Sequence, residues 1–260
     1  MTEIFTLFSS SAGNCTAIKS GETVLLVDAG GSCRRITCCL KEHGIDPHAL
    51  AGIVLTHEHS DHVSALRVLL KSLPIPVFGT FSTINFLADN DLVPPGAQLC
   101  PVAAGGMVGD IAFDLFPTQH DAGDTCGYTF CTPDGKKIGF ATDLGRFTGI
   151  VAESLSGSDA VVLESNYDPH MLEVSGYPYP LIRRIKGEYG HLSNEDCAAG
   201  CVQLLQSGVR HFLLAHTSKQ NNLEQLAYQT TLAALEGCGG AGQAQLEVAP
   251  KFGCSPVIVL

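Results

Sequence analysis

Residues 56–62 read THEHSDH, and this heptad limits the possible folds more than any other part of the sequence. It places His57, His59, Asp61 and His62 between an apolar run at 52–55 and a helical pattern at 63–73. Burying four such polar groups without partners is costly. Because one or two metal ions would satisfy all four, the heptad predicts a metal site at a strand-to-helix turn.

The composition sets the class of protein. With 260 residues, 45% of them hydrophobic, the chain is expected to form one domain over 1–260. No apolar stretch reaches the roughly 18 residues of a membrane span, and the N-terminus lacks the basic start of a signal peptide. Eleven cysteines without a Cys-x-x-Cys pair are typical of a reducing compartment. We therefore expect a cytoplasmic protein with no membrane partner.

The net charge bears on possible partners. A formal charge of −11 argues against binding of nucleic acid through a broad basic surface, because such a surface needs clustered Lys and Arg. Two divalent ions would add about four positive charges at the site itself. An anionic substrate therefore remains compatible with this acidic chain.

Strand and helix patterns alternate along the chain. Strands are expected over 23–27, 53–56, 76–79, 159–164, 209–215 and 255–260, and helices over 32–43, 63–73, 82–90, from 193 and over 223–235. Between 98 and 141 the pattern is β, with a hairpin turn at 133–135. Two halves of this kind predict two sheets packed face to face with helices outside.

Several of these strands end at a histidine or an acidic residue. These residues are Asp28, the heptad, His120, Asp143, Glu164 and His216. Strand ends that carry His or carboxylates to one edge predict a shared site rather than scattered polar residues.

The heptad divides its ligands between two ions. His57 and His59 alternate in an extended segment, so their rings project to the same side and share one ion. Asp61 and His62 begin the helical turn and face a second ion.

Three later residues are expected to complete the two sites. His120 completes the first, His216 completes the second, and Asp143 bridges both. Such N and O ligand sets suit Zn²⁺ or Mn²⁺, with Fe²⁺ also compatible. Two ions about 3.5–4 Å apart would hold a bridging hydroxide at neutral pH, which is the nucleophile of a metal-assisted hydrolysis.

A further polar segment, GHLSNED at 190–196, points to the substrate. Ser193 is expected to cap a helix whose N-terminus favours anions, and His191 stands just before it. Arg183 and Arg184 add a small basic cluster upstream. Together these groups describe a phosphate pocket, in which Glu164 orients His191 as a proton donor.

The HxHxDH pattern of the heptad, with the later ligands in the same order, resembles the metallo-β-lactamase superfamily. This resemblance implies an αββα four-layer sandwich with a dinuclear site at the edge of the sheets. It also implies that Asp28 supports a ligand instead of binding metal. The interval between Asp143 and His191 is too short for the inserted domain of the β-CASP nucleases.

Four segments resemble the YycJ/WalJ/VicX group of this superfamily: SSSAGNC (9–15), ESNYDPHML (164–172), GHLSNED (190–196) and HTSKQNN (216–222). The His191 element is also similar to the catalytic histidine motif of ribonuclease Z, which pairs with an upstream glutamate. The resemblance implies phosphodiesterase chemistry, and for this group a DNA exonuclease linked to repair. Thr217 and Tyr167 depart from the residues usual in the group, but neither is an expected ligand.

The expected mechanism has a scissile phosphate across the two metals, attacked by the bridging hydroxide, with Asp61, Glu164 and His191 as catalytic residues. Flanking phosphates and the cleft border are expected to involve Arg183, Arg184, Lys219, Asn221, Asn222, Ser11 and Asn14.

Other functions share the same ligands. A thioester or lactone hydrolase of the glyoxalase II type is the main alternative, and a metal-holding partner protein without catalysis is a second. A redox di-iron site is not expected, because His59 stands where such sites carry glutamate. The sequence leaves both DNA and RNA, and both exo- and endonucleolytic cleavage, open; the resemblance favours DNA.

Overall fold

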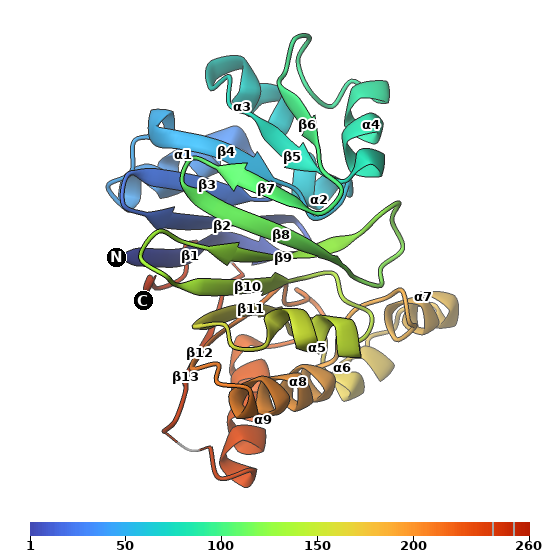
Figure 1. The fold of residues 1–260 in the computed structure, drawn as a ribbon. Helices are drawn as coiled ribbons and strands as arrows, with labels where there is room; N and C mark the ends of the chain where they lie inside the picture. Colours follow the sequence, from blue (N-terminus) through green and yellow to red (C-terminus); the bar gives the residue numbers. More distant parts are fainter. Residues whose placement is uncertain (241, 252) are drawn as a thin grey trace.

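The structure is a computed structural model that describes residues 1–240, 242–251 and 253–260. The described residues form two seven-stranded sheets packed face to face, with helices on both outer faces (Figure 1). This arrangement is the αββα sandwich predicted from the sequence, and it confirms that fold class.

Each sheet combines antiparallel and parallel strands. The first has the order β14-β1-β2-β3-β4-β5-β6 and the second β13-β12-β11-β10-β9-β8-β7. In the first, β1–β3 are antiparallel neighbours and β3–β6 are parallel. In the second, β7–β10 are antiparallel neighbours and β10–β13 are parallel. Both sheets therefore have an antiparallel part followed in the chain by a parallel part.

The strands of the first sheet are β1 Thr2–Ser10, β2 Gly13–Ser20, β3 Thr23–Val27, β4 Leu50–Val54, β5 Val77–Gly79, β6 Leu99–Pro101 and β14 Ile258–Val259. Those of the second are β7 Gly105–Val108, β8 Ile111–Pro117, β9 Cys126–Cys131, β10 Lys137–Ala141, β11 Ala160–Glu164, β12 His211–Ala215 and β13 Gln245–Val248.

The helices lie in two outer layers (Figure 1). Those around the first sheet are α1 Cys33–Glu42, α2 Ser60–Val63, α3 Leu66–Ser72 and α4 Phe81–Asp89, with a short 3₁₀ turn at Pro47–Ala49. Those around the second are α5 Gly149–Leu155, α6 Pro169–Glu173, α7 Tyr179–Ile185, α8 Asn194–Gln206 and α9 Glu224–Gly237. None of the helices in the described ranges is long and apolar enough to cross a membrane.

The central strands are apolar on both faces because each face meets a different core. In β3, Leu25 and Val27 point into the core between the sheets. Val24 and Leu26 point into the core beneath α1 and α3. Since successive side chains alternate across a strand, a continuous apolar run is what a strand covered on both sides requires.

Two sequence predictions about element bounds were wrong. The helix expected over 63–73 is broken into α2 and α3, because backbone hydrogen bonds join Ala29 N to His62 O at 2.8 Å and Ala65 N to Ala29 O at 2.9 Å. The strand expected over 255–260 pairs only at Ile258–Val259. Strands β1 and β2 were not predicted. That residues 1–260 make one domain stays a prediction.

The topology carries the polar strand ends to one edge of the sandwich. Asp28 follows β3, the heptad follows β4, and Asp143 follows β10. β8 runs parallel to β10 because each is antiparallel to β9, so His120 leaves the sheet at this same edge. Glu164 ends β11 and His216 follows β12.

Candidate metal centre

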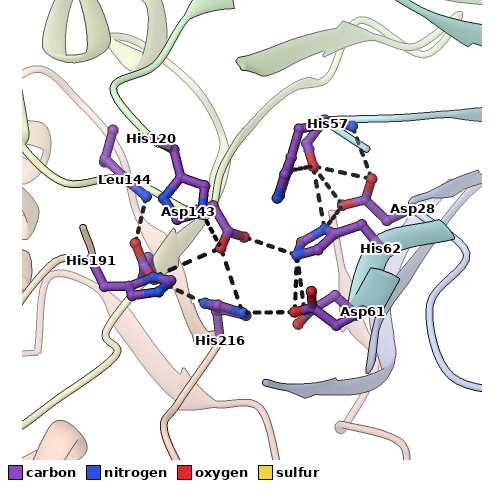
Figure 2. Close-up of polar contacts among 12 residues, drawn as sticks. Asp28, His57, Asp61, His62, His120, Asp143, Leu144, His191 and His216 are labelled. Carbon is purple, nitrogen blue, oxygen red and sulfur yellow. Dashed lines mark hydrogen bonds and ion pairs between the residues drawn. The ribbon is translucent and has the colours of Figure 1, made fainter. Parts of the chain in front are cut away.

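The expected metal ligands converge on this edge, and Figure 2 shows six of the seven. All of them except Asp143 form two groups of three, in each of which the ligand atoms lie within 4.8 Å of one another. One group is His57, His59 and His120, and the other is Asp61, His62 and His216. This division follows the pairs suggested by the heptad's spacing.

Asp143 lies between the two groups (Figure 2). Its carboxylate falls within 4.8 Å of ligand atoms of His57 and His62. Its Oδ1 also lies 3.5 Å from Nε2 of His120 and 3.7 Å from Nε2 of His216. One carboxylate therefore reaches both groups.

Most of these side chains are removed from water. His57 and His62 are 0% exposed, and Asp143 is 3% exposed. Asp61 keeps 23% of its side chain exposed. The centre is therefore a buried cluster with one open side.

Two histidines are oriented by carboxylates behind them. Nδ1 of His62 lies 2.8 Å from Asp28 Oδ2, and Nδ1 of His216 lies 2.9 Å from Glu164 Oε1. Because a carboxylate accepts, Nδ1 must carry a hydrogen in both rings, so that in the neutral form of each ring the lone pair is on Nε2. Such partners fix the tautomer of metal-binding histidines. Asp28 thus contacts an expected ligand from behind, and the supporting role that the sequence resemblance implied stays a prediction.

The other two buried histidines are held in the same way. Nδ1 of His120 donates to the carbonyl of Gly190 at 2.9 Å. Nδ1 of His57 lies 3.0 Å from the hydroxyl of Thr56. All four buried rings therefore have Nδ1 engaged and Nε2 left for the centre.

The unpaired atoms of the cluster fit divalent ions. Nε2 of His57 and Nε2 of His216 are buried, and neither has a hydrogen-bond partner within the part of the chain that the structure describes. A buried nitrogen without a partner needs an explanation. Imidazole and carboxylate donors at these spacings fit divalent metal ions.

The backbone is strained at two of these proposed ligands and at Asp28, which accepts from His62. Asp28, Asp143 and His216 have φ angles of 62°, 54° and 56°. Non-glycine residues rarely adopt this left-handed conformation, and they do so mostly where function requires it. The turns after β3, β10 and β12 are thus shaped to direct side chains to the centre.

The histidines and carboxylates of the cluster shift one another's pKa values towards the charged forms. Burial alone would lower the pKa of His62, but the carboxylates of Asp143 and Asp28 raise it well above its ordinary value. Burial would raise the pKa of Asp143, yet His216 and His62 lower it well below its ordinary value. Against the lowering effect of burial, Asp143, Asp61 and Glu164 raise the pKa of His216 to about 10. Carboxylates that stabilise cationic imidazoles in this way would equally stabilise a metal cation.

His191 lies beside the centre but is not one of the seven expected metal ligands. Its Nδ1 lies 2.8 Å from Glu164 Oε1, and its ring is 5.0 Å from that of His120. The side chain is 23% exposed, whereas Glu164 is completely buried. Nε2 of His191 is therefore the nitrogen left for a bound molecule.

Two residues of the segment 9–14 have different surroundings. Ser11 is exposed in the turn between β1 and β2, and an isolated bridge between Ser10 and Thr217 places that turn beside the loop after His216. Asn14 is 5% exposed, and its Nδ2 donates to Asp61 Oδ2 at 3.1 Å. Asn14 therefore supports a ligand, which differs from the substrate contact expected of it.

The basic residues expected at the cleft are not equivalent. Arg183 and Lys219 are exposed. Nε of Arg184 donates to Asp121 Oδ2 at 2.5 Å, and Asp121 Oδ1 lies 3.4 Å from Nε2 of His120. Arg184 is thus held by a carboxylate next to the ligands.

The asparagines of the segment 216–222 hold the loop together. Asn222 is 0% exposed, and its Nδ2 donates to the carbonyls of Ser165 and Asn166 at 2.9 and 3.1 Å. Asn221 is 2% exposed. Both side chains are buried in this structure, and the substrate contacts expected of them stay predictions.

The start of α8 is also less open than expected. Ser193 caps the helix as predicted, since its Oγ accepts from the N–H of Asp196 at 3.1 Å. However, Ser193 and Asn194 are 4% and 0% exposed, and Asn194 N donates to the carbonyl of Tyr167. This helix start packs against the segment after β11 and does not form part of an open phosphate pocket.

Sequence reasoning missed Thr56 and Asp121. The Thr56 hydroxyl donates to Asp28 at 3.0 Å and contacts His57. Both residues are direct neighbours of a ligand in the sequence, which was the available signal.

The comparison with protein families agrees with this geometry. Residues 23–217 match the model of the beta-lactamase superfamily domain. The chain belongs to the β-lactamase superfamily. Its curated relatives place it in the YycJ and WalJ group of that superfamily, as the sequence segments indicated.

Two of these relatives are similar over nearly their whole length. Exodeoxyribonuclease YycJ of Bacillus anthracis is 34% identical, over 92% of this chain and 91% of the relative. Exodeoxyribonuclease WalJ of Streptococcus pneumoniae is 31% identical, over 95% and 90%. Among solved structures, the metallo-β-lactamase fold protein YhfI of Bacillus subtilis superimposes with a TM-score of 0.74 at 12% identity, covering 98% of this chain and 100% of YhfI. That likeness supports the fold of this superfamily member.

Proposed function

We propose that this chain is a metal-dependent phosphodiesterase that degrades DNA from an end. Membership of a superfamily of metal-dependent hydrolases and the exodeoxyribonuclease names of its relatives support a nuclease. The seven clustered ligands support two divalent ions. Because five are imidazoles and two are carboxylates, we propose Zn²⁺ or Mn²⁺ as these ions.

The observation that carries this proposal is the pair formed by His191 and Glu164. An imidazole that is partly exposed, oriented by a buried carboxylate at 2.8 Å, and adjacent to the ligand His120 has the placement of a general acid. A phosphodiester needs such an acid, because its leaving group is a sugar oxygen that must gain a proton.

The residues of the chain have distinct tasks in this reaction. When bound, divalent ions would lower the pKa of a water nucleophile and offset the charge of the phosphate. His191 holds the proton at Nε2 for the leaving oxygen, and Glu164 fixes the ring by accepting from Nδ1. Asp28 and Asn14 hold His62 and Asp61 in place. Arg183, Lys219 and Ser11 are exposed, and we assign to them the contacts with flanking phosphates.

The experiment is a digestion of end-labelled single- and double-stranded DNA and RNA with added Mn²⁺ or Zn²⁺, beside a thioester assay. Wild-type protein should shorten DNA, and His191→Ala should lose about 100-fold or more in rate with its metal content unchanged. If only the thioester is hydrolysed, or if His191→Ala cleaves DNA normally, the proposal is wrong.

We also infer a cytoplasmic location. The eleven cysteines are all free thiols in the described chain, which supports a reducing compartment. A role in DNA repair, implied by the sequence resemblance, stays a prediction.

A further inference from the structure

A cavity of about 410 Å³ opens beside the metal centre, and nothing in the proposed chemistry uses it. His120, one of the proposed ligands, lines it, so the cavity borders the centre. Two aromatic side chains line it as well: Phe81 from the start of α4 and Tyr189 from the segment between α7 and α8. These elements belong to the two different outer layers of the sandwich (Figure 1).

Both rings are unusually exposed. Phe81 is 55% and Tyr189 is 58% exposed. Large aromatic side chains exposed in a concave site beside a reactive centre are typical of ligand contacts.

The backbone that carries Tyr189 is rigid. Its neighbour Gly190 donates to Gly187 O at 2.9 Å and accepts from His120 Nδ1. A Cβ added to Gly190 would lie 2.1 Å from the carbonyl oxygen of Ile185, and one added to Gly145 would lie 2.0 Å from that of Glu188. This close packing holds Tyr189 in a fixed position relative to His120.

The opposite wall of the cavity is fixed too. Gly123 N donates to Glu58 Oε1 at 2.8 Å, and the Thr80 hydroxyl donates to the carbonyl of Asp124 at 3.2 Å. The loop after His120 is thereby held to the heptad and to the start of α4, where Phe81 lies. A cavity preorganised in this way loses little entropy when a ligand binds.

The charge of the cavity excludes a phosphate as its occupant. Among the described residues that line it, Asp124 is the one acidic side chain, and neither Lys nor Arg is present there. A flat, uncharged group suits two aromatic rings and an acidic rim. In a nucleic acid, that group is a base.

We propose that this cavity binds the nucleobase adjacent to the scissile phosphate, stacked on Tyr189, with Phe81 on the second wall. This inference rests on the proposed nuclease function and names the part of the substrate that the site recognises. Stacking on an aromatic side chain accepts every base, because each has a π-face. The subsite therefore positions the terminal nucleotide without reading sequence.

The test uses the full chain reconstituted with Mn²⁺ and single-stranded DNA in which the nucleotide at the cleaved end is either normal or abasic. Wild-type kcat/KM should fall about tenfold on the abasic DNA, since one stacked base is lost. Tyr189→Ala should lose about tenfold on normal DNA and converge with wild type on abasic DNA, whereas Tyr189→Phe should retain the wild-type preference. Phe81→Ala should reduce the preference in the same direction.

The matched control is Phe86→Ala. Phe86 is 41% exposed and lines a different hollow, beside His59, so its removal should leave the preference for a normal base unchanged. Equal cleavage of normal and abasic DNA by wild type overturns the subsite while leaving the nuclease proposal intact. An equal loss for Tyr189→Ala on both DNAs, or loss of preference in Phe86→Ala alone, also overturns it. If wild type cleaves neither DNA, the nuclease proposal fails and the subsite fails with it.

Discussion

Oε1 of Glu164 lies 2.8 Å from Nδ1 of His191. The same oxygen lies 2.9 Å from Nδ1 of His216, and Oε2 accepts from the N–H of Leu144 at 2.6 Å. A single buried carboxylate therefore orients both the proposed general acid and a proposed metal ligand. It also holds the turn that follows Asp143.

Glu164→Gln should consequently damage two functions at once. The amide cannot accept from both imidazoles and from Leu144 N–H, so we expect a rate loss of about 100-fold or more. We also expect a 10- to 100-fold weaker metal affinity, roughly the cost of losing such a supporting partner. Initial rates and competition with a fluorescent zinc chelator measure the two effects.

His191→Ala is the control for that prediction, because His191 is not one of the proposed ligands. It should reduce the rate while leaving metal affinity at the wild-type value. Equal metal affinities for Glu164→Gln and wild type would show that Glu164 does not support His216.

Asp28→Asn should weaken metal binding, although Asp28 is not one of the proposed metal ligands. Asp28 accepts from Thr56 N at 2.9 Å and from His62 Nδ1 at 2.8 Å. Losing the carboxylate removes the group that fixes the His62 tautomer, and such changes cost about 10- to 100-fold in affinity. Isothermal titration of the metal-free protein with Zn²⁺ measures this change.

Asp134→Asn is its matched control. Asp134 lies in the turn before β10, at the sandwich edge opposite the centre, where it accepts from Thr2 and Thr132. The control variant should bind Zn²⁺ as wild type does. The Asp28 prediction is wrong if the two variants bind equally.

Removal of metal should destabilise the fold. At free metal about 1,000-fold above its Kd, binding stabilises a protein by about 4 kcal/mol, which for a chain of this size corresponds to a Tm shift on the order of 10 °C. Thermal unfolding with and without a chelator measures the shift. The chelator should have little effect on Asp143→Asn, in which asparagine tolerates the left-handed backbone but is a poor ligand. A chelator-independent wild-type Tm would contradict this prediction.

Cysteine reactivity should report the burial of β9, which Cys126 begins and Cys131 ends. Burial raises the pKa of Cys126 to about 12, while Cys131 is exposed. Because the thiolate reacts, a raised pKa lowers the reactive fraction at about pH 8. Peptide mass spectrometry after brief iodoacetamide treatment should find Cys131 alkylated and Cys126 protected, and both modified after denaturation. Equal native labelling of the two would show that this part of the fold is wrong.

Most strands of the parallel halves could be predicted, because continuous apolar runs such as Val24–Val27 end at turn or ligand residues. Strands β1 and β2 could not. Polar groups buried in them are paired with distant parts of the chain: Ser9 Oγ accepts from His216 N at 2.6 Å, and the backbone N–H of Thr6 donates to Ser255 Oγ at 2.9 Å. No local pattern encodes hydrogen bonds across more than 200 residues of sequence.

The same dependence on distant contacts explains why the clustering of the expected ligands could be predicted, while the surroundings of several loop residues could not. The strand ends brought His120 and His216 to the heptad because parallel strands share an edge. The pairing of Arg184 with Asp121 and the burial of Asn222 depend on how separate loops pack, which residue type and spacing do not determine. The expected substrate contacts depend on this loop packing and stay predictions, as do the expected metal ligands.

The most direct test of the central claim is a Mn²⁺ titration of the metal-free protein, followed by the release of end-labelled nucleotides from single-stranded DNA. A two-metal phosphodiesterase should have no activity at the start and should reach full activity at about two equivalents of tightly bound metal. Full activity in the metal-free protein, or saturation at one equivalent, would contradict the account.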